Sequence, residues 1–228
     1  MGAGASPAPR RPGRAERRLA PRAAAWHAGR VSLPDDSFLH APLTAFLDAL
    51  ATEDPLPGSG TAAALAAAMA AGLTAMAARR SAGEVPDAQE AVSEAEDLGE
   101  RLRLLAVANA DAFREASTSL GRIGDTQGAG RDERLGSDLA RAAYTPLSIA
   151  TLAAQVADLA AQVASGGVPD ARADAAAACC LAEGATRAAA HLVEINLAVT
   201  PADERAARVG DLAEAAGRAR ERAVAKAG

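Results

Sequence analysis

Hydrophobic residues recur at helical spacing in nearly every segment from Leu43 onward. The clearest row consists of Leu147, Ile149, Leu152, Val156, Leu159 and Val163. Spacings of three and four residues are typical of a helix with one apolar side. Val and Ile never alternate with polar residues for long enough to indicate a strand. The pattern therefore predicts an all-α domain, a bundle of about six or seven closely packed Ala-rich helices without a sheet.

The expected helices are separated by stretches rich in Gly and Pro. They cover residues 43–51, 61–78, 87–119, 132–143, 146–164, 170–199 and 201–225. Residues 1–40 are dominated by Arg, Pro and Ala and show no sustained helical pattern, so we expect a disordered tail. Residues 41–228 are expected to form one helical domain.

The segment 61–78 contains 18 residues without a charge, most of them Ala. Ala has the highest helix propensity, and a helix that is apolar on all sides is buried in a protein core or in a membrane. Its length reaches the lower limit for a membrane span. However, Leu65, Met69, Leu73 and Met76 form a single row, which favours packing against other helices in a water-soluble protein.

A Pro- and Gly-rich turn, 55–60, precedes this helix. A turn of this composition is often only a connection between elements. Alternatively, the free N–H groups in the first turn of the helix, which Ser59 or Thr61 can cap, suit an anion or carbonyl of a ligand. The turn is not a nucleotide phosphate loop, because the required Lys is missing.

Composition and charge exclude several functions. The net charge is −5, and residues 1–30 contain seven Arg and one Glu, so the remainder is more acidic than the total suggests. An acidic body repels nucleic acid. Cys179 and Cys180 are adjacent and have no other cysteine to pair with, which indicates a reducing, cytoplasmic location. Three histidines and the lack of a CxxC motif argue against a metal site.

Two acidic residues occur among apolar neighbours. Asp111 lies in an Ala-Asp-Ala-Phe segment, and Asp174 lies where its helix becomes almost purely Ala. Both have simpler explanations. Asp111 can form a surface ion pair with Arg114 or Arg103. Asp174 can be favoured by the positive end of its helix.

Six segments, in unbroken order, resemble the cyclodeaminase/methenyltetrahydrofolate cyclohydrolase family, which includes the cyclodeaminase domain of formiminotransferase-cyclodeaminase. They are Phe46–Ala51, Pro55–Thr61, Ala78-Arg79, Ala110–Phe113, Gly166–Asp174 and Asn196-Leu197. The resemblance covers about residues 43–225.

The resemblance implies an all-α homodimer that acts on a folate, without a cofactor or a membrane. The implied reactions are hydrolysis of methenyltetrahydrofolate to formyltetrahydrofolate and deamination of formiminotetrahydrofolate. Either reaction moves a proton, so it needs a positioned acid or base. The matching catalytic carboxylates are Asp111, as proton shuttle, and Asp174, as partner of the cationic ring or a pterin N–H. The implied substrate-binding residues are Pro57, Gly58, Ser59, Gly60, Thr61, Arg79, Gly166 and Asn196.

The chain also departs from the family pattern. Ser59 replaces the middle Gly of the loop, and Gly167, Ala173 and Leu192 replace an Asn, a Ser and an Asn. The single lysine of the chain is Lys226, so no lysine is available for catalysis, and Arg cannot act as a base at neutral pH. The second hypothesis is therefore a catalytically degenerate family member that acts as a folate-binding or helical interaction module.

Overall fold

A computed structural model describes residues 1, 37–54, 56–84, 87–123, 129–198 and 202–227, with side chains omitted at 37, 116–123 and 129–135. The chain divides into two units, Met1–Pro34 and Asp35–Gly228, and every element below belongs to the second. The expected tail falls largely outside the described residues.

The described residues form helices and no strand, which confirms the all-α prediction. The elements are a 3-10 helix, η2 (Ser37–Leu39), and seven α-helices: α2 (Leu43–Leu50), α3 (Ser59–Arg80), α4 (Ala88–Ile123), α5 (Ala129–Ala142), α6 (Tyr144–Gly166), α7 (Pro169–Asn196) and α8 (Glu204–Ala227). Local sequence explains several of their ends. Pro169 opens α7, where a missing N–H costs nothing, and Gly166 closes α6.

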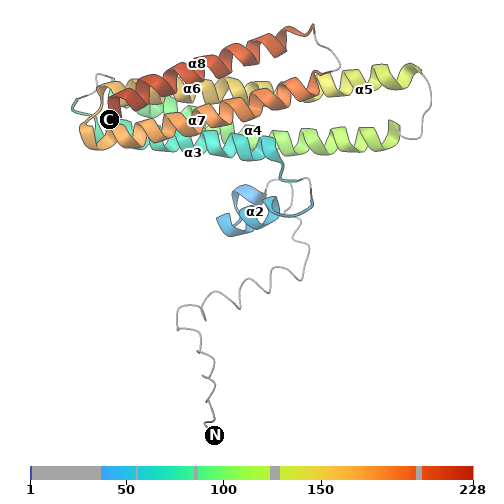
Figure 1. The fold of residues 1–228 in the computed structure, drawn as a ribbon, viewed down its shortest axis with the longest axis horizontal. Helices are drawn as coiled ribbons and strands as arrows, with labels where there is room; N and C mark the ends of the chain where they lie inside the picture. Colours follow the sequence, from blue (N-terminus) through green and yellow to red (C-terminus); the bar gives the residue numbers. More distant parts are fainter. Residues whose placement is uncertain (2–36, 55, 85–86, 124–128, 199–201, 228) are drawn as a thin grey trace. The chain divides into compact units, whose positions relative to one another are not determined.

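Helix α6 lies among the other long helices of the bundle, and α3 lies at its edge (Figure 1). α3 packs against α4, α6 and α7, and α6 packs against α3, α4, α7 and α8. The core consists mainly of Ala side chains, and its largest fully buried aliphatic residues are Leu102, Ile149, Val156, Val163, Val193, Leu197 and Val209. Small side chains let the helix backbones approach closely, as the composition predicted.

Helix α3 is antiparallel to both α4 and α7. Near its start, Thr61 contacts Ala106 of α4, and in its middle Ala71 lies beside Gly99. At its end, Ser81 lies beside Val168, which immediately precedes α7. Helix α7 therefore returns toward the start of α3, as its course in Figure 1 also shows.

Two described stretches are long and apolar enough to cross a membrane. They are α3 and the stretch Gly136–Gly166, whose windows are 56% and 72% buried inside the structure. The core helices of a water-soluble protein satisfy the same criterion, because they are buried against one another.

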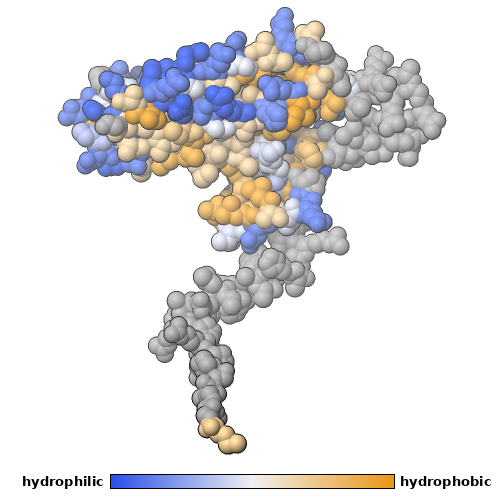
Figure 2. Space-filling model, viewed as in Figure 1, coloured by the Kyte–Doolittle hydropathy of each residue, from blue (hydrophilic) through white to orange (hydrophobic). Residues whose placement is uncertain are grey.

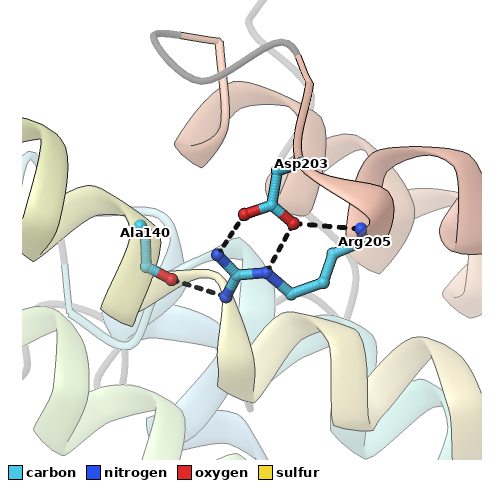
Figure 3. A network of polar contacts seen from close by, with 3 residues as sticks. All are labelled: Ala140, Asp203 and Arg205. Carbon is cyan, nitrogen blue, oxygen red and sulfur yellow. Dashed lines mark hydrogen bonds and ion pairs between the residues drawn. The ribbon is translucent and has the colours of Figure 1, made fainter.

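The start of α8 is fixed by a guanidinium–carboxylate pair (Figure 3). Arg205 donates from Nε to Asp203 Oδ1 at 2.9 Å, from Nη2 to Asp203 Oδ2 at 2.7 Å, and from Nη1 to the Ala140 carbonyl at 2.7 Å. Its guanidinium also lies 4.5 Å from the centroid of the Tyr144 ring. The hydrogen bonds from Arg205 lower the pKa of Asp203 to about 2.

Candidate functional site

The start of α3 is in unusually close contact with α4. A Cβ atom added to Gly60 would stand 2.6 Å from Nδ2 and 2.7 Å from Cγ of Asn109, closer than real Cβ atoms come to other heavy atoms. One turn earlier on α4, the Ala106 carbonyl accepts a hydrogen bond of 3.2 Å from Thr61 Oγ1. A side chain at position 60 would therefore force the Asn109 amide or the start of α3 to move.

The loop before α3 differs in detail from the expectation. The helix begins at Ser59, two residues earlier than predicted, and its N-cap residue is Gly58. The prediction that Ser59 or Thr61 caps this helix is wrong, because no side chain caps it and Thr61 bonds to α4 instead. The Leu56–Pro57 peptide bond of the loop is cis.

Asn109 was not singled out as a site residue by the sequence reasoning, although a signal was present. It lies seven residues after Leu102, which is fully buried, so it falls on the row of α4 that faces α3. A polar residue on an otherwise apolar row is the pattern that marks it. Phe113, four residues further along the same row, is 43% exposed.

Asp111 lies on a different side of α4 from Asn109. The two residues are two positions apart, which separates their side chains by about 200° around the helix. Asp111 accepts a hydrogen bond of 2.8 Å from Arg114 Nη1, and its side chain is 49% exposed. The ion pair that the sequence left open as an alternative is therefore confirmed, and Asp111 does not face Gly60 in this chain.

Arg79, Gly166 and Asp174 lie at the opposite end of α3. Asp174 Oδ2 accepts a hydrogen bond of 2.7 Å from Arg80 Nη1, and Arg79 pairs with Glu96. Gly166 ends α6 directly beside the contact between Ser81 and Val168, where the Val168 N–H donates to Ser81 Oγ at 3.2 Å.

The predicted site is therefore divided within one chain. Pro57, Gly58, Ser59, Gly60 and Thr61 lie at the start of α3, and Asn196, the last residue of α7, lies at the same end of the bundle. Arg79, Gly166 and Asp174 lie at the other end of α3, whose 22 residues span about 33 Å.

A cavity of about 540 Å³ opens between α4, α6 and α8. Its walls are mostly apolar but include two arginines; the lining residues are Arg101, Leu104, Leu105, Ala108, Leu147, Ser148, Thr151, Leu152 and Arg208. Asp111 follows Leu104 two turns later on the same row of α4, outside this cavity. Within the described ranges, no group of three His, Cys, Asp or Glu side chains could hold a metal ion.

These features define an all-helical bundle protein in which a Pro/Gly loop leads into an Ala-rich helix that is buried on the sides facing α4, α6 and α7. The sequence profile of the formiminotransferase-cyclodeaminase family matches residues 42–215, so the chain belongs to this family. The resemblance drawn from the motifs is thereby confirmed.

A solved structure shares the fold. It is the crystal structure of formiminotetrahydrofolate cyclodeaminase from Thermotoga maritima, which is 20% identical in sequence and superimposes with a TM-score of 0.68. The match covers 83% of this chain and 95% of that one. None of the curated proteins matches the sequence.

Proposed function

We propose that the protein is a cytoplasmic folate one-carbon enzyme that needs no cofactor beyond its tetrahydrofolate substrate. It either hydrolyses methenyltetrahydrofolate to formyltetrahydrofolate or deaminates formiminotetrahydrofolate. The observation that carries the proposal is the family match over residues 42–215, which includes the loop, Asn109 and both aspartates. The homodimer implied by the resemblance is part of the same proposal.

The start of α3 suits the reacting end of a folate. Its first N–H groups have no intrahelical partner, and no side chain caps them. They form the positive end of the helix, which attracts a carbonyl or formyl oxygen. Beside them, the Asn109 amide offers both a donor and an acceptor, as recognition of a pterin edge requires. The exposed face of Phe113 supplies an aromatic surface against which a ring can stack.

The chemistry needs one group that moves a proton. In the hydrolysis, water adds to the bridging carbon and loses one proton; the hydroxyl then loses its proton as it becomes the formyl oxygen, while the bond from that carbon to nitrogen 5 breaks and this nitrogen gains a proton. In the deamination, nitrogen 10 attacks the formimino carbon and loses its proton, the former imino nitrogen is protonated, and its bond to the carbon breaks as ammonia leaves. Asp111 and Asp174 are the proposed carboxylates, and a carboxylate accepts a proton most effectively when it is held within hydrogen-bond reach of the reacting water.

One observation favours the degenerate module instead. Asp111 is held by Arg114 on a side of α4 that does not face Gly60, and the chain has no lysine at a comparable place. A protein of this kind would keep the loop and Asn109 for binding and would lack turnover.

The test measures the absorbance of methenyltetrahydrofolate with purified protein and in buffer alone. We expect the protein to accelerate loss of the methenyl band, and Asp111→Asn to reduce the rate at least tenfold. Asp97→Asn is the matched control, because Asp97 is also paired with an arginine on α4, Arg101, at 3.2 Å. If the rate equals that in buffer and calorimetry detects folate binding, the enzyme hypothesis is rejected in favour of the folate-binding module.

A further inference from the structure

We propose that the cavity between α4, α6 and α8 binds a small amphipathic carboxylate, whose charged end pairs with Arg208 and Arg101 and whose apolar body packs against leucines of α4 and α6. The inference goes beyond the proposed function, because the cavity is separate from the loop and Asn109. Asn109 follows Ala108 of the cavity in the sequence, but consecutive side chains lie about 100° apart around a helix, and Asn109 faces α3.

The cavity exists because two helices pack on α6 without packing on each other. Within the described residues, α6 has extensive contacts with both α4 and α8, whereas α4 and α8 hardly touch. α6 therefore forms the floor, with Leu147 and Leu152, and α4 forms one wall, with Leu104 and Leu105. The volume of about 540 Å³ lies within the range of roughly 300–1,000 Å³ that is typical of small-molecule sites.

The apolar part of the lining is exposed but confined. Leu104 is 63% exposed, so a ligand that covers it gains the free energy of burying a leucine side chain. Figure 2 shows that much of the surface over α8 is hydrophilic. The apolar lining is therefore local rather than part of a broad apolar surface over that helix, which fits a small molecule better than a protein partner.

The hydroxyl groups of the lining are not available as donors to an anion. Ser148 Oγ donates to the Tyr144 carbonyl at 3.1 Å, and Thr151 Oγ1 donates to the Leu147 carbonyl at 2.8 Å. A hydroxyl has only one proton to donate. The lining residues also lie within helices, where the backbone N–H groups are already bonded. The donors that remain for an anion are the two guanidinium groups.

These two arginines give the cavity a positive charge. Arg208 forms no hydrogen bond and no ion pair with any residue that the structure describes. Arg101 donates to Asp97 at 3.2 Å, in a pair whose members are both exposed, and a ligand can replace so weak a pair. No acid lines the cavity, although the whole chain has a net charge of −5. The local charge therefore attracts an anion.

The first turn of α8 holds the backbone of Arg208 in place. Arg205, three residues earlier, is fixed by hydrogen bonds to Asp203 and to the Ala140 carbonyl and lies over the Tyr144 ring. Residues three positions apart share one side of a helix, so Arg208 faces the bundle on the same side as Arg205. A helix end that is already ordered lowers the entropic cost of binding.

The donors suit a carboxylate better than a phosphate. A guanidinium group presents parallel N–H groups that match the two oxygens of a carboxylate. Phosphate sites usually add the N–H groups of a helix start or of a glycine-rich loop, and the lining of this cavity contains neither. A carboxylate with an apolar body is either a free acid, such as a medium-chain fatty acid, or the aminobenzoylglutamate end of a folate.

Calorimetry with the purified full-length chain tests the binding and identifies the source of the carboxylate. We expect octanoate to bind with a Kd below about 1 mM, and octanol, which lacks the charge, to bind at least about tenfold more weakly. Binding of octanoate but not p-aminobenzoylglutamate supports a free acid, and binding of p-aminobenzoylglutamate supports the end of a folate. If neither carboxylate binds, or if octanol binds as well as octanoate, the inference is wrong. No turnover is measured, so the result is independent of the proposed function.

Two pairs of variants test whether the ligand lies in the cavity. Arg208→Gln is expected to weaken binding at least about tenfold, whereas Arg218→Gln, an exposed arginine of α8 outside the cavity, should leave it unchanged. Ala108→Phe fills the cavity and should abolish binding, whereas Ala215→Phe, at another exposed alanine, should not. Circular dichroism checks that each variant is folded. Equal binding by Arg208→Gln and Arg218→Gln, or undiminished binding by Ala108→Phe, would overturn the inference.

Discussion

Replacing Gly60 by Ala probes the contact on which the proposed site depends. The new Cβ would stand 2.6 Å from Nδ2 and 2.7 Å from Cγ of Asn109, so either the amide or the start of α3 must move. In a helix Ala is favoured over Gly by about 1 kcal/mol. Overpacking at a close contact costs about 1–3 kcal/mol. We therefore expect Gly60→Ala to lower the free energy of unfolding by about 1 kcal/mol net.

Gly210→Ala serves as the control, because it brings the same helix preference without a close contact. It should raise the free energy of unfolding by up to about 1 kcal/mol. The double variant Gly60→Ala/Asn109→Ala removes the amide that the new methyl group meets. It should recover most of the loss, which corresponds to a coupling of about 2 kcal/mol between the two positions.

Urea unfolding followed by circular dichroism at 222 nm measures these three variants, the wild type and Asn109→Ala, which the coupling requires, all at one concentration because the unfolding of an oligomer depends on concentration. For a domain of this size, about 1 kcal/mol corresponds to a shift of about 2–4 °C in Tm. If Gly60→Ala is as stable as Gly210→Ala, or if removing the Asn109 amide brings no recovery, the close packing of α3 on α4 at this point is refuted.

Three further predictions concern the bundle. Burial raises the pKa of Cys179 to about 12, so Cys180→Ser protein should resist alkylation at pH 8 until urea is added, as mass spectrometry would show. Arg205 lowers the pKa of Asp203 from 3.8 to about 2. The stability that this pair contributes is therefore present above about pH 4 and is lost as the pH falls toward 2. Asp203→Asn should reduce the change in the free energy of unfolding with pH across that range, as unfolding curves at several pH values would show. Ser81→Ala leaves a backbone N–H at the start of α7 without its acceptor and should cost about 1–2 kcal/mol in urea unfolding.

The architecture was predictable from the sequence because helix formation depends on local spacing. The rows of apolar residues and the Gly and Pro breaks located every helix of the bundle, with errors of a few residues at the ends. α4, for example, continues to Ile123 through Gly121, which was expected to start a loop. A glycine in a helix costs only about 1 kcal/mol, and 36 residues of helix outweigh it.

The site was harder to predict because chain neighbours are not helical neighbours. Asp111 drew attention because Ala110 and Ala112 flank it in the sequence. On a helix, however, its neighbours are three and four residues away, and one of them is Arg114. The contact between Gly60 and Asn109 joins residues far apart in the sequence, and no local pattern encodes such a pair. Motif order placed Asp174 in the family site, yet the structure places it beside Arg80, at the other end of α3 from Gly60.

The sequence left two environments open for α3, a membrane and a protein interior, and the outward side of this helix bears on the choice between them. This side carries no charge between Ser59 and Ala78, and it exposes Met69 and Met76. A membrane would have to contact it together with the helices on either side. Those flanks carry charges: Arg79 pairs with Glu96 of α4 on one side, and Arg80 pairs with Asp174 of α7 on the other. Charged pairs inside lipid are costly. A protein surface can cover this side of α3 and leave both pairs at its rim, where water reaches them, so these charges favour a protein partner over lipid.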